Sequence, residues 1–473
     1  MRLRMNLAGR ACPQRAGPDV LQARRAARRD GLAPPGSWGE CKVIKPRQLS
    51  MRACLRGFGM RFILLPILIA GTRLLTNALV ASDDWPQFLG PTRDGVYSGP
   101  ALSSSWPKEG PTIVWQKKVG QGFSGPVVAS GKLILFHRVG DRETVEAFDA
   151  RTGAALWKFD YPTGYRDDFG FDEGPRATPA IADGKVFTFG AEGKLHCLEL
   201  ATGKNLWSVS TQEKFSASKG FFGLACSPLV ESDRVLLNIG GTGGAGIVAF
   251  DKNTGALAWR ATSDEASYSS PAAVELNGKR VAIFFTRSGL TILEAATGKL
   301  QTQFPWRPRI NASVSAATPL VIGTQIFLSA SYDLGAILLD LKTGRPQKIW
   351  ASDEALSNHY ATSAHRNGFL YGFHGRQESG PSLRCVELQT GTVKWSEDRF
   401  PAGTVTLAGD SLLVMLEDGR LLLAPATPER FKPSAQAQVL PFGVRAHPAL
   451  ANGYFYTRSK DKLVCVNLVA TPQ

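Results

Sequence analysis

The sequence predicts an all-β fold, an eight-bladed β-propeller of four-stranded blades, and three observations predict it. An eleven-residue unit, seen at Ala147 to Trp157, recurs along the chain with a Thr-Gly pair and a downstream Trp in register. Successive Thr-Gly pairs are 50, 52, 43, 46 and 47 residues apart, a period typical of one propeller blade. The 473 residues also include 49 Gly and 29 Pro, which favours many turns over long helices.

Residues 1–81 are predicted to precede the propeller and not to form part of it. Residues 1–59 are rich in Arg and lack apolar periodicity, so they are interpreted as an unstructured basic leader or a mis-assigned start. Residues 60–81 combine a basic flank with an apolar run and predict a signal peptide, with Met1, Met51 and Met60 as alternative starts. Because Arg73 interrupts the run, we expect a periplasmic or secreted protein with no stable membrane span in the mature chain.

The charge of the chain lies mostly in this leader. The formal net charge is +15, but residues 1–60 hold 13 Lys or Arg against 3 Asp or Glu. From Ser82 onward the balance is only about +3. A basic surface on the folded part is therefore not indicated, and we expect no nucleic-acid partner.

The cysteine pattern argues against metal and dithiol chemistry. Cys197, Cys385 and Cys465 occupy the same position in three repeats, where Ala stands in two others, so each is predicted to be a small buried hydrophobe. No two cysteines are adjacent and no Cys-x-x-Cys occurs. The sequence predicts no metal site.

Residues 82–111 precede the ring. The stretch from Asp84 to Gly95 is rich in Pro and Gly and predicts an extended N-terminal arm, followed by the propeller over residues 112–473.

Eight inner strands and eight outer strands are predicted. Each inner strand begins at a small or polar residue that is often followed by Pro, where a missing N–H is tolerated. These starts are Gly125, Thr178, Ser227, Ser270, Thr318, Thr362, Thr404 and His447. Outer strands are marked by Trp115, Trp157, Trp207, Trp259, Phe304, Trp350, Trp395 and Phe431.

Ring closure follows from this count. The chain ends without a last outer strand, and the strand of Trp115 stands alone at the start, so it is predicted to complete the eighth blade. The seventh blade departs from the repeat, with Ala426-Thr427-Pro428 in place of Thr-Gly.

The Thr-Gly pair and the Trp are assigned structural roles. Gly accepts the left-handed conformation that a tight turn needs, and a Trp on the outer strand packs a large ring against the neighbouring blade. The predicted docking tryptophans are Trp115, Trp157, Trp207, Trp259, Trp350 and Trp395.

Residues just ahead of the inner strands are expected to surround one mouth of the central channel. Their aromatic, Arg and His side chains suit an anionic or planar polar ligand. The alternative is that the loops are solvated and that Arg176 or Arg445 pairs with a neighbouring carboxylate. The candidate ligand-binding residues are Arg176, Phe222, Tyr268, Asn311, His359, Tyr360, Arg445 and His447.

The Ala-x-Asp-x-x-Thr-Gly-x-x-x-Trp units at Ala147 to Trp157 and Ala249 to Trp259 resemble the tryptophan-docking motif of the PQQ-binding-like β-propeller repeat family. The resemblance covers roughly Trp85 to Leu468. It implies a propeller, and it is shared by quinoprotein alcohol dehydrogenases and by BamB-like scaffolds. It therefore indicates a fold more strongly than an activity.

Two functions follow from the resemblance. The first is an exported binding or protein-interaction module of the cell envelope, without a catalytic set or cofactor, whose partner is an envelope protein, a polymer or a small molecule. The second is a PQQ-dependent alcohol or sugar dehydrogenase with the quinone and Ca²⁺ at the channel mouth. The dehydrogenases imply an adjacent Cys pair and a Glu, Asn and Asp metal set, and the first of these is missing here. No residue is assigned a catalytic role, and we lean towards a protein that is not an enzyme.

Overall fold

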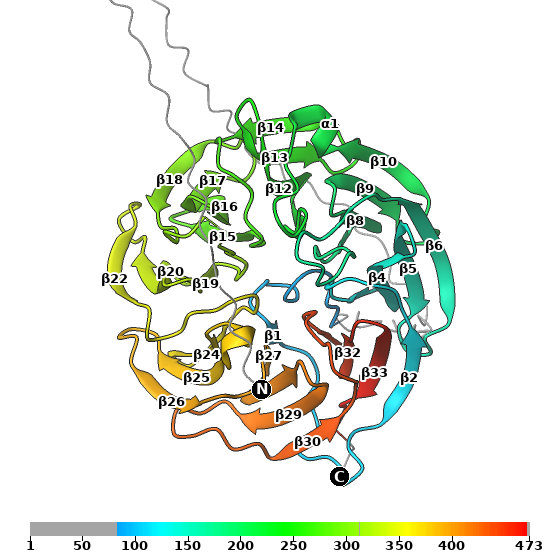
Figure 1. Cartoon of the computed structure of the whole chain (residues 1–473), viewed down its shortest axis with the longest axis vertical. Coiled ribbons are helices and arrows are strands. Elements are labelled where there is room, and N and C mark those ends of the chain that lie inside the picture. Colours follow the sequence, from blue (N-terminus) through cyan, green and yellow to red (C-terminus); the bar gives the residue numbers. More distant parts are fainter. Residues whose placement is uncertain (1–82, 312, 471–473) are drawn as a thin grey trace, which may run out of the picture. The chain divides into compact units, whose positions relative to one another are not determined.

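The computed structural model describes residues 83–311 and 313–470, which form a ring of eight β-sheets (Figure 1). The expected leader and signal peptide lie outside the described residues. The eight-bladed propeller predicted from the repeats is confirmed.

The first four blades follow the chain without crossovers. Blade 1 comprises β3 (Val127–Ala129), β4 (Lys132–Val139), β5 (Arg142–Asp149) and β6 (Ala155–Pro162). Blade 2 comprises β7 (Ala180–Ala182), β8 (Lys185–Phe189), β9 (Lys194–Glu199) and β10 (Asn205–Ser210), and the short helix α1 (Thr211–Phe215) follows it. Blade 3 comprises β11 (Leu229–Glu231), β12 (Arg234–Gly241), β13 (Ala245–Asp251) and β14 (Leu257–Ala261). Blade 4 comprises β15 (Ala272–Leu276), β16 (Lys279–Thr286), β17 (Gly289–Glu294) and β18 (Leu300–Pro305).

The other four blades complete the circle. Blade 5 comprises β19 (Leu320–Ile322), β20 (Gln325–Ala330), β21 (Gly335–Asp340) and β22 (Gln347–Ser352). Blade 6 comprises β23 (Ala364–Arg366), β24 (Phe369–His374), β25 (Ser382–Glu387) and β26 (Val393–Glu397), with the 3₁₀ turn η1 (Gln377–Ser379) between β24 and β25. Blade 7 comprises β27 (Gly403–Ala408), β28 (Ser411–Leu416), β29 (Arg420–Pro425) and β30 (Ala435–Gln438). Blade 8 comprises β31 (Ala449–Ala451), β32 (Tyr454–Arg458), β33 (Lys462–Asn467) and β2 (Ile113–Lys118).

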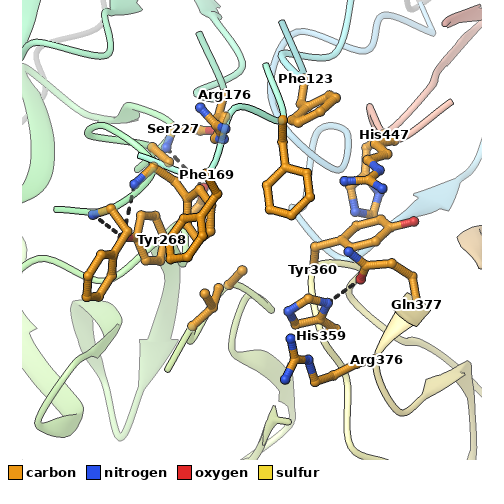
Figure 2. Close-up of a pocket in the computed structure, with 18 of the residues that line it drawn as sticks. Phe123, Phe169, Arg176, Ser227, Tyr268, His359, Tyr360, Arg376, Gln377 and His447 are labelled. Atoms are coloured by element: carbon orange, nitrogen blue, oxygen red, sulfur yellow. Dashed lines mark hydrogen bonds between the residues drawn. The ribbon is translucent and has the colours of Figure 1, made fainter. Parts of the chain in front are cut away.

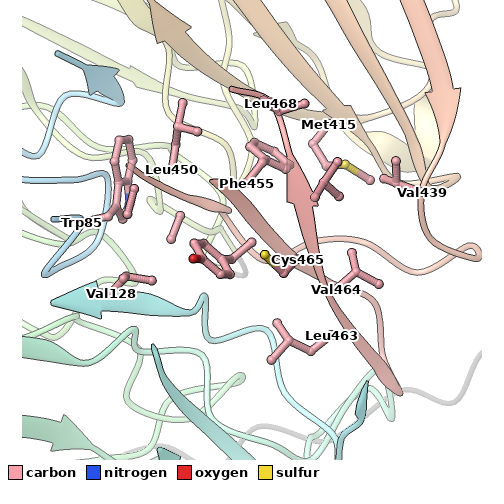
Figure 3. Packing of buried hydrophobic residues seen from close by; sticks show 14 of the residues in the cluster. Trp85, Val128, Met415, Val439, Leu450, Phe455, Leu463, Val464, Cys465 and Leu468 are labelled. Carbon is pink, nitrogen blue, oxygen red and sulfur yellow. The ribbon is translucent and has the colours of Figure 1, made fainter. Parts of the chain in front are cut away.

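Ring closure occurs as the sequence predicts. β2 pairs antiparallel with β33, and Trp115 lies opposite Cys465. A large buried cluster covers this seam and joins blades 7, 8 and 1, with Met415, Phe455 and Trp85 among its members (Figure 3). Closure therefore covers the free edge of β33, the last strand of the chain, and adds a core at the junction.

The middle strands are apolar on both faces because each is covered by a neighbouring blade. β13 and β28 are buried along nearly their whole length, whereas the outer strand β10 alternates between exposed and partly buried residues. The repeat cysteines fit this pattern. Within the described residues all four cysteines are free and buried, which confirms the expectation of small hydrophobes for Cys197, Cys385 and Cys465.

The outer strand of blade 7 was placed wrongly around Phe431. The strand there is β30, which begins four residues later, because Pro428 and Pro433 interrupt strand pairing between β29 and it. Phe431 instead packs its ring 5.6 Å from that of Trp395. Blade 7 also gains a fifth strand, since β1 (Val96–Tyr97) pairs in parallel with β27.

Each repeat tryptophan except Trp395 lies on the Thr-Gly turn of the next blade, and Trp395 lies on the Ala426-Thr427-Pro428 turn. Trp157 donates its indole N–H to the carbonyl of Leu200 at 2.9 Å, and its ring covers Gly203. A Cβ on Gly203 would come within 2.5 Å of that ring, so only glycine fits. The other indole N–H groups donate to backbone carbonyls in the same way: Trp115 to Ala150, Trp207 to Lys252, Trp259 to Ala295, Trp350 to Leu388 and Trp395 to Thr427.

The junction between blades 4 and 5 lacks this contact. Phe304 has no indole N–H, and a Cβ on Gly344, in the facing turn, would meet nothing within 4 Å. This junction is a natural control for the others.

Hydroxyl groups at the starts of the inner strands join successive blades around the channel. The backbone N–H of Gly125 donates to Thr178 Oγ1 at 3.0 Å, and the N–H of Thr178 donates to Ser227 Oγ at 2.9 Å. The N–H of Ser227 continues the series to Ser270. The recurrent Ser or Thr before Pro is therefore explained by a hydrogen bond between blades.

An isosteric pair of substitutions tests this arrangement. Thr178→Val removes the acceptor of a buried N–H and is expected to lower the free energy of unfolding by about 2 kcal/mol. Thr318 occupies the equivalent position, but its Oγ1 is buried and has no hydrogen-bond partner among the described residues. Thr318→Val is therefore expected to be neutral or slightly stabilising. Chemical denaturation of both variants measures the difference, and equal losses would contradict the role of the hydrogen bond.

The N-terminal arm crosses the central channel, which its composition did not predict. Trp85 is 2% exposed and exchanges two backbone hydrogen bonds with Val128 in blade 1. Gly95 accepts from the N–H of Leu407 in blade 7. Between them, Arg93 is 3% exposed and donates to the carbonyls of Pro228 at 2.5 Å and Pro271 at 2.6 Å. The first part of the arm and β1 lie inside the ring in Figure 1, and the rest of the arm runs out along blades 7 and 8.

Candidate functional site

A cavity of about 340 Å³ lies at the channel mouth formed by the loops that lead from one blade into the next. Its walls come from the residues ahead of the inner strands and from the connections β20–β21 and β24–β25. Phe88 of the N-terminal arm is among the lining residues and packs edge-to-face on His447, 5.0 Å between ring centroids. Because the arm crosses the channel here, the cavity is a cup with a floor.

The structure brings together seven of the eight candidate ligand-binding residues. The seven that line the cavity are Arg176, Phe222, Tyr268, His359, Tyr360, Arg445 and His447. Asn311 does not line it. Asn311 is exposed and its carbonyl accepts a hydrogen bond from Arg287, whereas Val314 and Ala316, closer to β19 in the same loop, line the cavity.

Several aromatic lining residues were missed by sequence reasoning. Phe169 and Phe171 belong to the loop between blades 1 and 2, and Phe221 to the loop after α1. Phe169 is 56% exposed and stacks near Phe222, with centroids 5.3 Å apart. The sequence signal that could have identified them is the unusual length of these loops, because residues in a shorter connection between blades would not reach the channel mouth.

Buried polar contacts fix the aromatic loops. Arg138 is 4% exposed and donates to the carbonyls of Tyr165 at 2.7 Å and Glu173 at 3.1 Å, which holds the ends of the loop that carries Phe169 and Phe171. The hydroxyl of Tyr268 accepts backbone N–H bonds from Phe221 at 3.0 Å and Phe222 at 3.3 Å. These hydrogen bonds therefore hold the aromatic residues of the rim in place.

Two arginines contact the ring of Phe123. The guanidinium of Arg176 lies 5.4 Å and that of Arg445 5.5 Å from the centroid of Phe123, and Figure 2 shows Phe123 and Arg176 among the side chains around the cavity. Each arginine also has a carboxylate partner, since Arg176 pairs with Asp167 at 2.5 Å and Arg445 pairs with Glu417. Such pairing was the alternative to ligand binding that the sequence left open for these arginines. The arginines are thus held in place by cation–π contacts and ion pairs.

A third arginine lies on the part of the wall that the β24–β25 connection forms. The guanidinium of Arg376 is 4.7 Å from the ring centroid of Tyr332 and 3.3 Å from the carboxylate of Glu378. His359 links the β20–β21 connection to the β24–β25 connection. One of its ring nitrogens lies 3.1 Å from the Tyr332 hydroxyl, and the other forms a hydrogen bond with Gln377 (Figure 2). Burial lowers the pKa of His359, so its imidazole is neutral at pH 7.

His447, near the floor, makes stability depend on pH. Burial lowers its pKa from 6.5 to about 4, so the unfolded chain takes up a proton before the folded protein does. The free energy of unfolding is therefore expected to fall as the pH drops from about 6.5 to about 4, by up to about 3 kcal/mol from this residue.

The comparison with His447→Phe checks this. Phe has no titrating group, so the variant is expected to lose that part of the slope while keeping an aromatic contact for Phe88. Glu143, whose pKa is raised by burial, contributes a slope of opposite sign in both proteins and cancels in the difference. Denaturant titrations at several pH values measure the two slopes, and parallel curves would contradict the assignment.

The cavity residues do not fit PQQ with Ca²⁺. A calcium ion needs several oxygen ligands that converge, and no group of three or more His, Cys, Asp or Glu is placed to hold a metal among residues 83–311 and 313–470. The carboxylates nearest the cavity already pair with arginines, and the described cysteines lie in separate blades. These residues are therefore assigned no catalytic step that involves the quinone.

The ring, its docked tryptophans and the Thr-Gly turns define a PQQ-like repeat propeller. The family described as outer membrane protein assembly factor BamB matches residues 141–397, more than half of the chain, and the chain belongs to this family.

Curated relatives fall into two groups. Outer membrane protein assembly factor BamB of Shewanella oneidensis is 25% identical over 316 residues, which cover 63% of this chain and 73% of that protein. Quinohemoprotein alcohol dehydrogenase ADH-IIG of Pseudomonas putida is 31% identical over 139 residues, 28% of this chain. The match spans only 18% of the length of that dehydrogenase.

Solved structures share the fold. BamB from Moraxella catarrhalis superposes with a TM-score of 0.57 at 16% identity, covering 76% of this chain and 99% of that one. Quinohemoprotein alcohol dehydrogenase from Comamonas testosteroni gives a TM-score of 0.60 at 16% identity, covering 83% and 81%. In the part of the chain that the structure describes, no helix is long and apolar enough to cross a membrane.

Proposed function

We propose that this protein is an exported binding module of the cell envelope, without a catalytic role, and that it recognises its partner at the cup-shaped cavity. The observation that carries the proposal is the composition of the cavity wall. Aromatic rings and arginines line it, and the carboxylates that could serve as bases or metal ligands are occupied by ion pairs. Such a wall binds and orients a ligand, since large rings and guanidinium groups supply most of the energy in interfaces.

The relatives support the same choice. The match to the Shewanella assembly factor spans 73% of that protein, whereas the match to the Pseudomonas dehydrogenase spans 18% of its length. A factor for the assembly of outer membrane proteins has to contact other proteins, so an envelope protein is the favoured partner here. Localisation in the periplasm follows from this proposal together with the expected signal peptide.

Site-specific photo-crosslinking in living cells tests the proposal. A photoreactive amino acid replaces Phe169 at the mouth, and in the control it replaces Leu206, which is 42% exposed on the outer strand β10. We expect crosslinked envelope proteins from residue 169 and none, or different ones, from residue 206. Identical products from both positions would contradict recognition at the cavity.

Cofactor addition tests the alternative. The purified protein is mixed with PQQ and Ca²⁺ and assayed for reduction of a dye by alcohols. We expect no turnover. Turnover that is lost in an Arg445→Gln variant would overturn the binding-module proposal in favour of a quinone-dependent dehydrogenase.

A further inference from the structure

We infer that the cavity receives one aromatic side chain of a partner polypeptide, while an Asp or Glu beside that residue is bound by Arg376 and Arg445. This inference rests on the proposed function and specifies its ligand.

The shape of the cavity selects an inserted side chain. The arm closes the channel beneath it, because Phe88 lines the floor and Arg93 bonds to blades 3 and 4. A polypeptide therefore cannot thread through the ring. Ligand pockets generally have volumes of about 300–1,000 Å³, and a cavity of about 340 Å³ is at the small end, with room for a large side chain but not for a helix or strand.

The walls select an aromatic side chain. Phe88, Phe123 and Phe222 present ring faces or edges to the cavity, and Tyr268 and Tyr360 continue the wall. Aromatic pairs gain about 0.5–1.5 kcal/mol beyond the area that they bury, when rings meet edge-to-face or offset. The exposed rim ring of Phe169 extends this surface outward, where it would meet the residues that flank an inserted ring.

The charges select a neighbouring carboxylate. Three guanidinium groups but a single carboxylate, that of Glu378, line the cavity, and Asp167 and Glu417 lie behind their arginines, outside the lining. In the described part of the chain, the only hydrogen bond of the Arg445 guanidinium is made by Nε, to Glu417. Its two terminal nitrogens are therefore available for a carboxylate, which guanidinium groups bind in a bidentate manner.

His359 lines the cavity together with Arg376 and Arg445 and senses the charge of both. Burial is the main cause of its lowered pKa, and the charges of the two arginines lower the pKa further. The hydrogen bond to Gln377 and the charge of Glu378 act on this pKa in the opposite direction. Glu378 and Glu417 each pair with one of these arginines at its Nε, and the neutral imidazole adds no charge. An acidic ligand group would be the preferred partner of their terminal nitrogens.

Calorimetric titration of the purified protein with a short capped peptide tests the inference. The probe is acetyl-Gly-Ser-Trp-Asp-Ser-Gly-amide, compared with two versions in which Trp is replaced by Ala or Asp by Asn. We expect the Trp-Asp peptide to bind, the Asn version to bind about tenfold more weakly, and the Ala version to show no binding. Equal affinity for all three peptides, or no binding of any, would overturn the ligand class.

Protein variants locate the contact. Arg445→Gln and, independently, Arg376→Gln are each expected to weaken the Trp-Asp peptide about tenfold but to leave the Asn peptide unchanged, since the carboxylate is the group they bind. Arg345→Gln, at an exposed arginine in the β21–β22 turn, is the matched control and should change nothing. Equal losses for both peptides, or a loss in the control, would contradict the assignment.

Two further outcomes separate this inference from the proposed function. If crosslinking at residue 169 captures envelope proteins while the Trp-Asp peptide does not bind, the binding module stands and the ligand class is wrong. Phe442→Ala distinguishes the cavity from a generally adhesive face, because Phe442 is 71% exposed in the loop before β31 but does not line the cavity. Weaker peptide binding in that variant would count against insertion into the cup.

Discussion

Gly203→Ala is expected to lower the free energy of unfolding by about 3 kcal/mol, because two penalties combine at this position. The residue has φ of +74°, which costs an alanine about 1 kcal/mol. The new Cβ would also lie 2.5 Å from the ring of Trp157, which must shift and weaken its contact with the Leu200 carbonyl. The junction between blades 1 and 2 would then lose its docking contact.

Gly344→Ala is the matched control for this prediction. Gly344 follows Thr343 in the corresponding turn of blade 5 and has a similar φ of +79°, but its Cβ would meet nothing within 4 Å. Only the conformational penalty of about 1 kcal/mol is expected there. Denaturant unfolding of the two variants is expected to give free energies of unfolding that differ by about 2 kcal/mol, and this difference is the contribution of the tryptophan contact. Equal destabilisation would show that the turn conformation alone matters and that the docking contact contributes little.

The fold could be predicted because each blade repeats the same local chemistry. The Thr-Gly turn and the Trp recur at fixed spacing, so the number of blades and the closure by the Trp115 strand follow from counting. Blade 7 shows where counting fails. Its turn contains Pro428 instead of Thr-Gly, and the extra residues place the outer strand after Phe431, which a repeat pattern cannot indicate.

The site was predictable where it depends on the inner strands and not where it depends on loops. Seven candidate residues directly precede inner strands, so the ring geometry alone brings them to one mouth. Phe169 and Phe171 reach the cavity through a long connection that Arg138 holds from another strand, a contact with no signal in the sequence. Asn311 lies too early in its loop, because Val314 and Ala316, closer to β19, are the residues of this loop that line the cavity.

The arm was the least predictable element, and it decides what the cavity is. A stretch rich in Pro and Gly indicates turns, but nothing in its composition shows that it lies inside the channel. Its placement depends on pairings with distant strands, such as the N–H of Ile181 with the carbonyl of Pro86. Without the arm the ring would enclose an open channel, and with it the mouth becomes a cup.

Arg93→Ala is expected to have the largest effect on the arm. The buried guanidinium hydrogen-bonds to the Gln87 side chain and to two carbonyls, with no ion pair in the described part of the chain. Burial lowers its pKa to about 10, so it remains charged at pH 7. Removing it leaves the carbonyls of Pro228 and Pro271 buried without their donors. Each unsatisfied group costs about 1–3 kcal/mol, so a loss of about 4 kcal/mol is expected.

Hydrogen exchange shows whether that loss comes from the arm. The amide of Ile181 donates to Pro86 and the amide of Leu407 to Gly95, so both are expected to exchange faster in Arg93→Ala. Amides in the β4–β5 pairing, such as that of Val145, make no contact with the arm and should stay protected. Arg345→Ala, at an exposed site, should alter neither set. Uniformly faster exchange across all blades would mean that Arg93 stabilises the ring as a whole, and unchanged exchange at Ile181 and Leu407 would mean that the arm holds its place without it.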